Sequence, residues 1–215
     1  MRKTWIVGLA ALFPALAWAG SNLVVNASFE NKEQALYGWQ YKYLEEGESW
    51  YFKNHEYVSV VPENDGRKSV LRLNVADQSL ADTQGVKVDS QPIPIKPGAK
   101  YRFSAWCRST GPNCRIMVEG YKWRPNVTKH DNPTLYELRK IYKFKPLWFG
   151  EMKAGRLGEP SKTWVRASMK LPDEQLSPIA QKNFDSVDFL VVHVIGIAGT
   201  KGEVFVDDIE LEQSN

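Results

Sequence analysis

The stretch that decides the fold class runs from Tyr101 to Trp123 and reads YRFSAWCRSTGPNCRIMVEGYKW. Apolar residues alternate with polar or charged residues on both sides of a central segment, Arg108–Asn113, that is rich in turn-forming residues. β-Branched and aromatic side chains are frequent in both halves, as they are in half-buried strands. The stretch therefore predicts two antiparallel strands joined by a turn.

The same alternation recurs outward from this stretch along the rest of the chain. Clusters of Gly, Pro, Asn and Asp separate the alternating segments, for example Pro62–Gly66 and Gly199–Gly202. Many short strands with frequent turns favour an all-β jelly-roll β-sandwich. Pro172–Lys182 is expected to form a short turn or a helix broken at Pro178. The predicted strands are Leu23–Asn26, Trp50–Lys53, Tyr57–Val61, Val70–Val75, Gly85–Val88, Tyr101–Arg108, Cys114–Trp123, Trp164–Leu171, Val187–Ile195 and Glu203–Leu211.

The first residues have the pattern of an export signal. Arg2 and Lys3 precede an apolar run that ends before Ala17-Trp18-Ala19, a pattern typical of a signal-peptide cleavage site. The run is short for a membrane span, although a membrane anchor is the alternative. We expect a signal peptide over residues 1–19 and one domain over residues 20–215, exported to the periplasm or the exterior. Residues 124–162 are an atypical excursion, expected as an extra strand or an insertion.

Charge and motifs exclude several classes of function. Without residues 1–19 the net charge is about +1, which gives no electrostatic reason to expect binding to nucleic acid or to an anionic membrane. The three histidines, His55, His130 and His193, belong to no two-histidine helix motif or Cys/His cluster. A nucleophile elbow and a phosphate-binding loop are also missing from the sequence. We therefore expect no enzyme, with a small polysaccharide lyase as a distant alternative.

Cys107 and Cys114 flank the turn at the centre of the opening stretch. Export would permit a disulfide between them, and this bond would close a hairpin; two free thiols, or a pair of metal ligands, are the alternatives. If the two cysteines lie opposite each other, one face of the hairpin carries Phe103, Ile116 and other apolar residues. The other face carries a mixture of charged and aromatic side chains: Arg102, Ser104, Trp106, Arg108, Arg115, Met117, Glu119, Tyr121 and Trp123.

This mixed face predicts a carbohydrate-binding surface. A flat aromatic ring can cover the C–H side of a sugar, while charged side chains bond its hydroxyls. Trp106, Tyr121 and Trp123 are the expected stacking residues. Arg102, Arg115 and Glu119 are the expected hydroxyl ligands, and Tyr51 and His193 are further candidates. Alternatively, Tyr121 and Trp123 pack beneath the excursion and Trp106 is sheltered by long polar side chains.

Three blocks of sequence resemble carbohydrate-binding modules of the galactose-binding-like jelly-roll type, as appended to xylanases and glucanases. They are Asn22–Glu30 with Gly38-Trp39, then Gln91–Trp106, then Gly202–Leu211. The resemblance implies non-catalytic binding of a polysaccharide or glycan. A structural or protein-interaction domain that has lost sugar binding, with a protein partner, is the alternative.

The same resemblance implies a structural Ca²⁺ between the first and last strands. The matching positions are Glu30 and Asp207, with Asp208 as a second choice. Two carboxylates with backbone carbonyl oxygens would suit this ion, which binds several oxygen ligands. The alternative is a pair of solvated acidic residues at strand ends.

Overall fold

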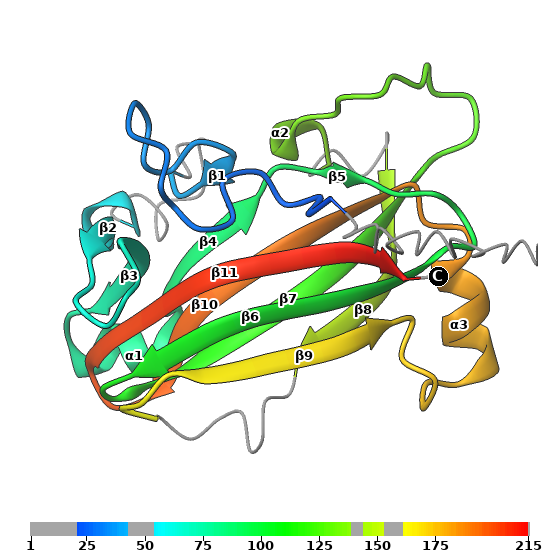
Figure 1. Cartoon of the computed structure of the whole chain (residues 1–215). Coiled ribbons are helices and arrows are strands. Elements are labelled where there is room, and N and C mark those ends of the chain that lie inside the picture. Colours follow the sequence, from blue (N-terminus) through cyan, green and yellow to red (C-terminus); the bar gives the residue numbers. More distant parts are fainter. Residues whose placement is uncertain (1–20, 43–53, 139–143, 153–160, 215) are drawn as a thin grey trace, which may run out of the picture.

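The computed structural model describes residues 21–42, 54–138, 144–152 and 161–214, which fold into two antiparallel sheets packed face to face (Figure 1). Sheet A has the strand order β1-β4-β10-β7-β8, with β5 also paired to β10. Its strands are β1 (Trp39–Gln40), β4 (Val86–Ser90), β5 (Ile93–Pro94), β7 (Pro112–Trp123), β8 (Phe144–Met152) and β10 (Phe189–Gly199). Sheet B has the order β2-β3-β11-β6-β9. Its strands are β2 (Val58–Pro62), β3 (Ser69–Val75), β6 (Lys100–Ser109), β9 (Val165–Leu171) and β11 (Gly202–Ser214).

Short helices cover the ends of the sandwich. They are η1 (Asn54–Tyr57), α1 (Gln78–Thr83), α2 (Leu135–Leu138) and α3 (Pro178–Phe184). Pro178 starts α3 and does not break it, because Ser177 is the N-cap and a proline at the first helical turn loses no hydrogen bond. Among the described residues, no helix is long and apolar enough to cross a membrane.

The predicted all-β jelly-roll fold is confirmed, with local differences. The segment Leu23–Asn26 is a turn and not a strand, although the Leu23 amide still donates a 2.9 Å hydrogen bond to the Leu211 carbonyl. The segment Trp50–Lys53 lies outside the described residues. Within the 124–162 excursion, β8 adds a strand to sheet A beside β7.

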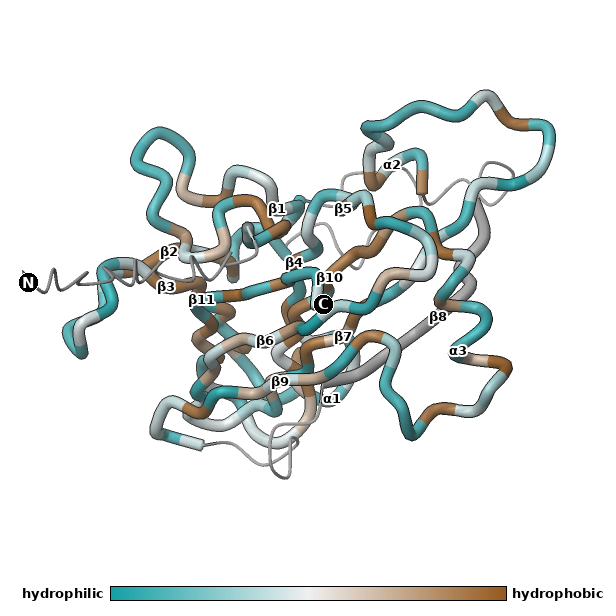
Figure 2. Tube along the Cα trace, turned by 45° about the vertical axis from the view of Figure 1, so that its right-hand side comes forward, coloured by the Kyte–Doolittle hydropathy of each residue, from teal (hydrophilic) through white to brown (hydrophobic). Residues whose placement is uncertain are grey.

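Buried apolar side chains from both sheets form the core. Apolar stretches run along β7 and β10, while the connecting loops are mostly hydrophilic (Figure 2). From sheet B, Phe103 and Leu211 are fully buried, and from sheet A, Ile116 and Val192 are fully buried. Alternation within each strand therefore correctly predicted which side chains of the opening stretch face the core.

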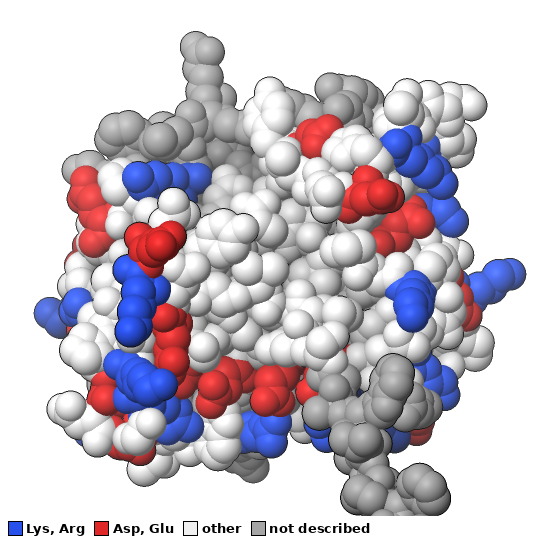
Figure 3. Space-filling model, turned by 45° about the horizontal axis from the view of Figure 1, so that its top comes forward, with Lys and Arg blue, Asp and Glu red and all other residues white. Residues whose placement is uncertain are grey.

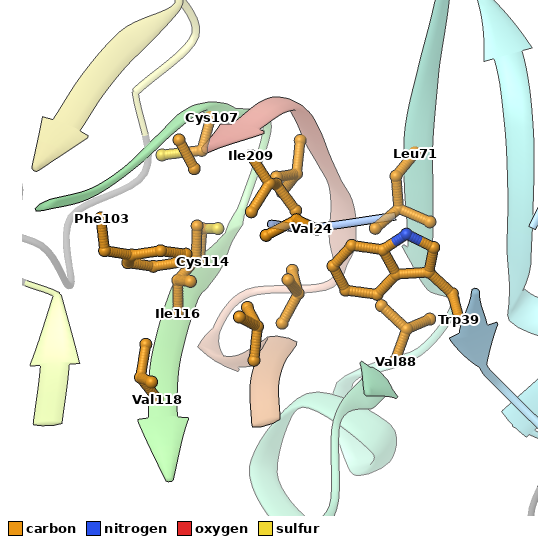
Figure 4. Close-up of a cluster of buried hydrophobic side chains, with 14 of the residues drawn as sticks. Val24, Trp39, Leu71, Val88, Phe103, Cys107, Cys114, Ile116, Val118 and Ile209 are labelled. Carbon is orange, nitrogen blue, oxygen red and sulfur yellow. The ribbon is translucent and has the colours of Figure 1, made fainter. Parts of the chain in front are cut away.

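The predicted pairing of the two cysteine-bearing strands is wrong. Cys107 in β6 lies opposite Val206 of β11, whereas Cys114 in β7 lies opposite Gly196 of β10. Both cysteine side chains lie among the buried apolar side chains of the core (Figure 4). The turn between β6 and β7 crosses from sheet B to sheet A. It packs on the β10–β11 connection, since the Thr110 amide donates to the Glu203 carbonyl at 2.9 Å.

Both cysteines are buried free thiols in the structure, and no disulfide joins them. The two side chains are hydrogen-bonded to each other across the core. A disulfide between them would therefore link the two sheets, and would not close a hairpin as the sequence interpretation assumed.

Candidate functional site

The outer face of sheet A carries a continuous row of polar side chains. Antiparallel register places His193 of β10 between Asp89 of β4 and Met117 of β7. The next outward-facing position along β7 is Glu119, followed by Tyr121 beyond Gly120. We call Lys87, Asp89, Glu119, Tyr121 and His193 the polar cluster of sheet A.

Ion pairs and hydrogen bonds connect the whole polar cluster. His193 Nδ1 lies 2.7 Å from Asp89 Oδ1, and His193 Nε2 lies 3.4 Å from Glu119 Oε2. The Tyr121 hydroxyl donates a hydrogen bond to the Glu119 carboxylate. Lys87 Nζ lies 3.3 Å from Asp89 Oδ2. The network therefore runs across three strands, and each side chain holds its neighbour in place.

The two carboxylates keep the imidazole of His193 charged at neutral pH. Burial alone would lower the pKa of His193, but hydrogen bonding and the charges of Asp89 and Glu119 outweigh it and raise the pKa to about 9. Burial acts to raise the pKa of Glu119, yet its partners His193 and Tyr121 leave that pKa below its ordinary value. With Lys87 and Asp89 also paired, the cluster has no net charge.

The polar cluster offers hydrogen-bond donors and acceptors beside an aromatic ring. Lys87 can donate, the carboxylate of Glu119 can accept, and Tyr121 presents a half-buried ring with a hydroxyl. Asp89 is only 3% exposed and His193 Nε2 is buried, so these two side chains support their neighbours. Because salt bridges orient these groups before a ligand arrives, little side-chain entropy would be lost on binding. This arrangement suits a neutral ligand rich in hydroxyl groups.

Trp123 is not available as a stacking residue, contrary to the prediction. Its side chain is only 5% exposed and packs with Phe189 and His130, at ring centroid distances of 6.0 and 5.2 Å. Leu135 and Leu138 of α2 belong to the same buried cluster. The excursion therefore covers this end of β7, because it brings enough apolar surface to bury the indole.

Trp106 and Arg102 lie on the opposite side of the molecule, on the outer face of sheet B. The placement on one face with Glu119 is wrong because β6 and β7 belong to different sheets. Trp106 is sheltered by the guanidinium of Arg67, 5.1 Å from the ring centroid. Arg102 forms a 3.0 Å ion pair with Glu212 of β11. Neither residue can act together with the polar cluster.

A further predicted ligand residue, Arg115, stands apart from the predicted partners Glu119 and Tyr121. It is exposed on the outer face of β7, opposite Ile195, which pairs on its other side with Lys87. Arg115 lies six positions before Tyr121, which corresponds to about 20 Å along a strand. Tyr51 falls outside the described residues. Of the predicted ligand residues, the structure brings together Glu119, Tyr121 and His193.

Sequence reasoning missed Lys87 and Asp89. The predicted strand ended at Val88, while β4 extends to Ser90. The alternation of Val86 and Val88 with Lys87 and Asp89 carried a signal for the outward placement. Nothing in the sequence indicated that Asp89 lies beside His193, since β4 and β10 are far apart along the chain.

One of the two predicted calcium ligands, Asp207 in sheet B, is a buried carboxylate. Asp207 is 3% exposed, and its Oδ1 has no hydrogen-bond partner among the residues that the structure describes. Burial and the charges of Asp208 and Glu30 raise the pKa of Asp207 to about 7, against the opposing effects of an Asp208 backbone hydrogen bond and Arg67. Glu30 pairs with Lys68 at 3.3 Å.

One oxygen of the Asp207 carboxylate is open to a cation, because Oδ2 already lies 3.4 Å from Arg67 Nε and Oδ1 does not have a partner among the described residues. A buried carboxylate oxygen without a hydrogen-bond partner has lost its contacts with water and gained none in return. A divalent cation would supply the missing interaction. The described part of the chain contains no group of three or more His, Cys, Asp or Glu side chains that could hold a metal ion. Backbone carbonyls or waters would have to supply the remaining oxygens beside Glu30 and Asp207.

Solved structures with similar folds include binding modules and enzymes. One is titled "Family 16 Carbohydrate Binding Module-2", with 16% identity and a TM-score of 0.48 over 88% of this chain and 99% of that chain. An arabinose-bound α-L-arabinofuranosidase has 13% identity and a TM-score of 0.50, over 89% of this chain and 26% of that chain. A cyclase from Fischerella sp. TAU has 12% identity and a TM-score of 0.48, over 89% of this chain and 96% of that chain. At this level of identity, the likeness concerns the fold.

Comparison with curated proteins finds no match. The profile of a family described as "Carbohydrate binding domain" matches residues 21–122, from the N-terminal loop to the end of β7. This range includes Lys87, Asp89, Glu119 and Tyr121 of the polar cluster. The resemblance to jelly-roll carbohydrate-binding modules is thus confirmed, and over residues 21–122 the chain matches the carbohydrate-binding domain family.

Proposed function

We propose that this chain binds a polysaccharide or glycan on the outer face of sheet A and does not change it chemically. The family match supports this function. The observation that carries the site is the preoriented network of Asp89, His193, Glu119 and Tyr121 on an outer sheet face. We also propose that the chain is exported, so that it would meet its ligand outside the cytoplasm; the supporting pattern is the one in residues 1–19.

The polar cluster would bind sugar through both kinds of contact that a glycan needs. Tyr121 would stack on a pyranose ring, and Glu119 would accept hydrogen bonds from its hydroxyls. His193 and Asp89 would act mainly by fixing the carboxylate of Glu119. Because binding would depend on one described aromatic ring and a few hydrogen bonds, we expect weak affinity that increases with polymer length.

Affinity electrophoresis on a panel of soluble polysaccharides tests this proposal. Tyr121→Ala and Glu119→Gln should each lower the apparent affinity, measured from the retardation of the folded protein, at least fivefold. Arg102→Ala is the matched control, because Arg102 carries a similar predicted role but lies on sheet B. Equal loss of retardation in Arg102→Ala, or none in Tyr121→Ala, would refute the site.

The absence of catalysis needs its own test, because Tyr121, Glu119 and His193 are also groups that can transfer protons. Retarding polysaccharides should be incubated with the protein and assayed for unsaturated sugars and new reducing ends. We expect no product above that of heat-denatured protein. Product formation that disappears in Tyr121→Phe would overturn the non-catalytic proposal.

A second candidate function is a protein-interaction domain without sugar binding. The observation in its favour is that Trp106 and Trp123, two of the three expected stacking residues, are covered by other side chains. A folded protein that binds nothing across a broad polysaccharide and glycan panel would favour this second function over the first.

A further inference from the structure

A groove of about 890 Å³ lies between the N-terminal loop, the β4–β5 connection and the excursion. It begins next to the polar cluster, since its Ser90 follows Asp89, but no residue of the polar cluster lines it. One wall contains Gln34–Trp39, a second contains Ser90–Pro94, and a third contains Asn132–Thr134. This volume is in the range of sites that hold small organic ligands. Figure 3 brings this side of the molecule forward and shows a broad hollowed surface without charged side chains, bordered by charged ones.

The lining of the groove is uncharged. Every described residue that lines it lacks a charged side chain, and several are aromatic or proline. Tyr37 is 54% exposed, which is unusual for so large an apolar ring. Three amide side chains, Gln34, Gln91 and Asn132, are exposed at the same groove. Aromatic rings beside amides are suited to C–H surfaces and hydroxyl groups, and not to ionic ligands.

Local hydrogen bonds hold two walls of the groove in place. The Asn26 side-chain amide donates to the carbonyls of Ala35 and Tyr37, at 2.9 and 3.2 Å. The backbone N–H of Gln91 donates a 2.8 Å hydrogen bond to the Gly38 carbonyl, and this bond connects the first two walls. Gly38 has a φ of +81°, and a Cβ there would lie 3.0 Å from Val25. The turn that presents Tyr37 therefore requires glycine at this position.

The third wall, which belongs to the excursion, is held in place by α2. Thr134 and Glu137 cap the start of α2 reciprocally, with the Glu137 amide donating to Thr134 Oγ1 at 3.2 Å and the Thr134 amide to Glu137 Oε2 at 3.0 Å. Leu135 and Leu138 are then buried against Trp123. The groove is thus framed before any ligand arrives, which lowers the entropic cost of binding.

We propose that this groove is a second binding site, for a short neutral oligosaccharide. The uncharged lining disfavours uronic acids, sulfated sugars and charged peptides, each of which would lose hydration without gaining an ion pair. A proline-rich peptide would use the aromatic residues, but it would leave most of the side-chain amide oxygens of the groove unpaired, because proline has no N–H to donate. The proposal shares its ligand class with the proposed function but uses none of the residues of the polar cluster.

Isothermal titration of the full chain with cellohexaose, xylohexaose and laminarihexaose tests the second site, with polygalacturonate and decaproline as comparison ligands. Tyr37→Ala and Gln91→Ala should each weaken binding of at least one hexasaccharide at least fivefold. Both variants should keep the binding at the polar cluster, which is the binding that Tyr121→Ala removes. Both groove residues are exposed, and thermal melts would confirm that each variant is folded.

The outcomes separate this proposal from the proposed function. Binding that depends on Tyr37 or Gln91 and survives Tyr121→Ala supports the groove even if the sheet A site fails. Binding that needs Tyr121 and is unchanged in both groove variants overturns the groove and leaves the proposed function intact. Preference for decaproline or polygalacturonate over every neutral hexasaccharide also overturns the groove proposal. The absence of binding by the folded wild-type protein overturns both sites for these ligands.

Discussion

His193 Nδ1 lies 2.7 Å from Asp89 Oδ1, and the two residues are 104 positions apart in the chain. The contact joins β10 to β4. With Glu119 on its other side, the imidazole has a pKa of about 9 in the folded protein. The ordinary pKa of a histidine is close to 6.5, so folding favours the protonated form. This difference couples the stability of sheet A to pH.

The first prediction concerns this coupling. Because the pKa is raised on folding, the stabilisation is fully present below about pH 6.5 and is lost as pH rises through about 9. The shift corresponds to a contribution on the order of 3 kcal/mol at most. In urea denaturation, the free energy of unfolding of wild type should therefore fall over this range relative to His193→Gln. Parallel pH profiles for the two proteins would contradict the prediction.

The second prediction concerns Trp123, which the structure assigns to packing. Trp123→Ala should lower the free energy of unfolding by about 3–5 kcal/mol, as expected for an aromatic residue in an apolar cluster. Chemical denaturation measures this loss. Ile179→Ala is a suitable control because Ile179 is 74% exposed, and it should change stability by less than about 0.5 kcal/mol. If the Trp123→Ala protein had normal stability but no longer bound polysaccharide, Trp123 would be a ligand-binding residue and the packing assignment would be wrong.

These residues show what alternation in the sequence can predict. The period of two correctly separated Ile116 and Val118, which are buried, from Glu119 and Tyr121, which lie on an outer face. Alternation defines the two faces of a strand but does not say which sheet contains the strand. A turn such as Thr110-Gly111 can close a hairpin or cross between sheets, and only its packing on the β10–β11 connection decides between them.

The candidate site was predictable in part for the same reason. Glu119, Tyr121 and His193 were found because each faces outward on a strongly alternating strand. Grouping them with Trp106 required a strand pairing that the protein does not have. Asp89 was missed because its importance comes from a neighbour distant in sequence, and such contacts depend on the order of strands in the sheet.

The third prediction tests calcium at Asp207. Above the pKa of about 7, Asp207 carries a buried charge whose Oδ1 has no partner among the described residues. Millimolar Ca²⁺ should therefore raise Tm relative to a chelator, because an ion that binds the native state alone stabilises it. Differential scanning calorimetry at a pH above 7 measures the shift.

Two variants sharpen this calcium test. Asp207→Asn should abolish most of the calcium-dependent change in Tm, whereas Glu174→Gln, which alters an exposed carboxylate near α3, should retain it. Magnesium should be a weaker substitute, because it requires a tighter octahedral set of ligands. Identical Tm values with Ca²⁺ and with chelator would remove Glu30 and Asp207 from consideration as ligands.

The fourth prediction concerns Cys107 and Cys114, whose thiols meet across the core from opposite sheets. In an oxidising compartment we expect a disulfide that links β6 to β7, with a stabilisation of about 2–3 kcal/mol for so short a loop. Thiol titration of the denatured protein, isolated without reductant, should then find no free cysteine. Reduction should lower Tm in the wild type and should leave Tm unchanged in the Cys107→Ala, Cys114→Ala double variant. Two free thiols in protein recovered from the periplasm or from the culture medium would show that the pair serves only as core packing.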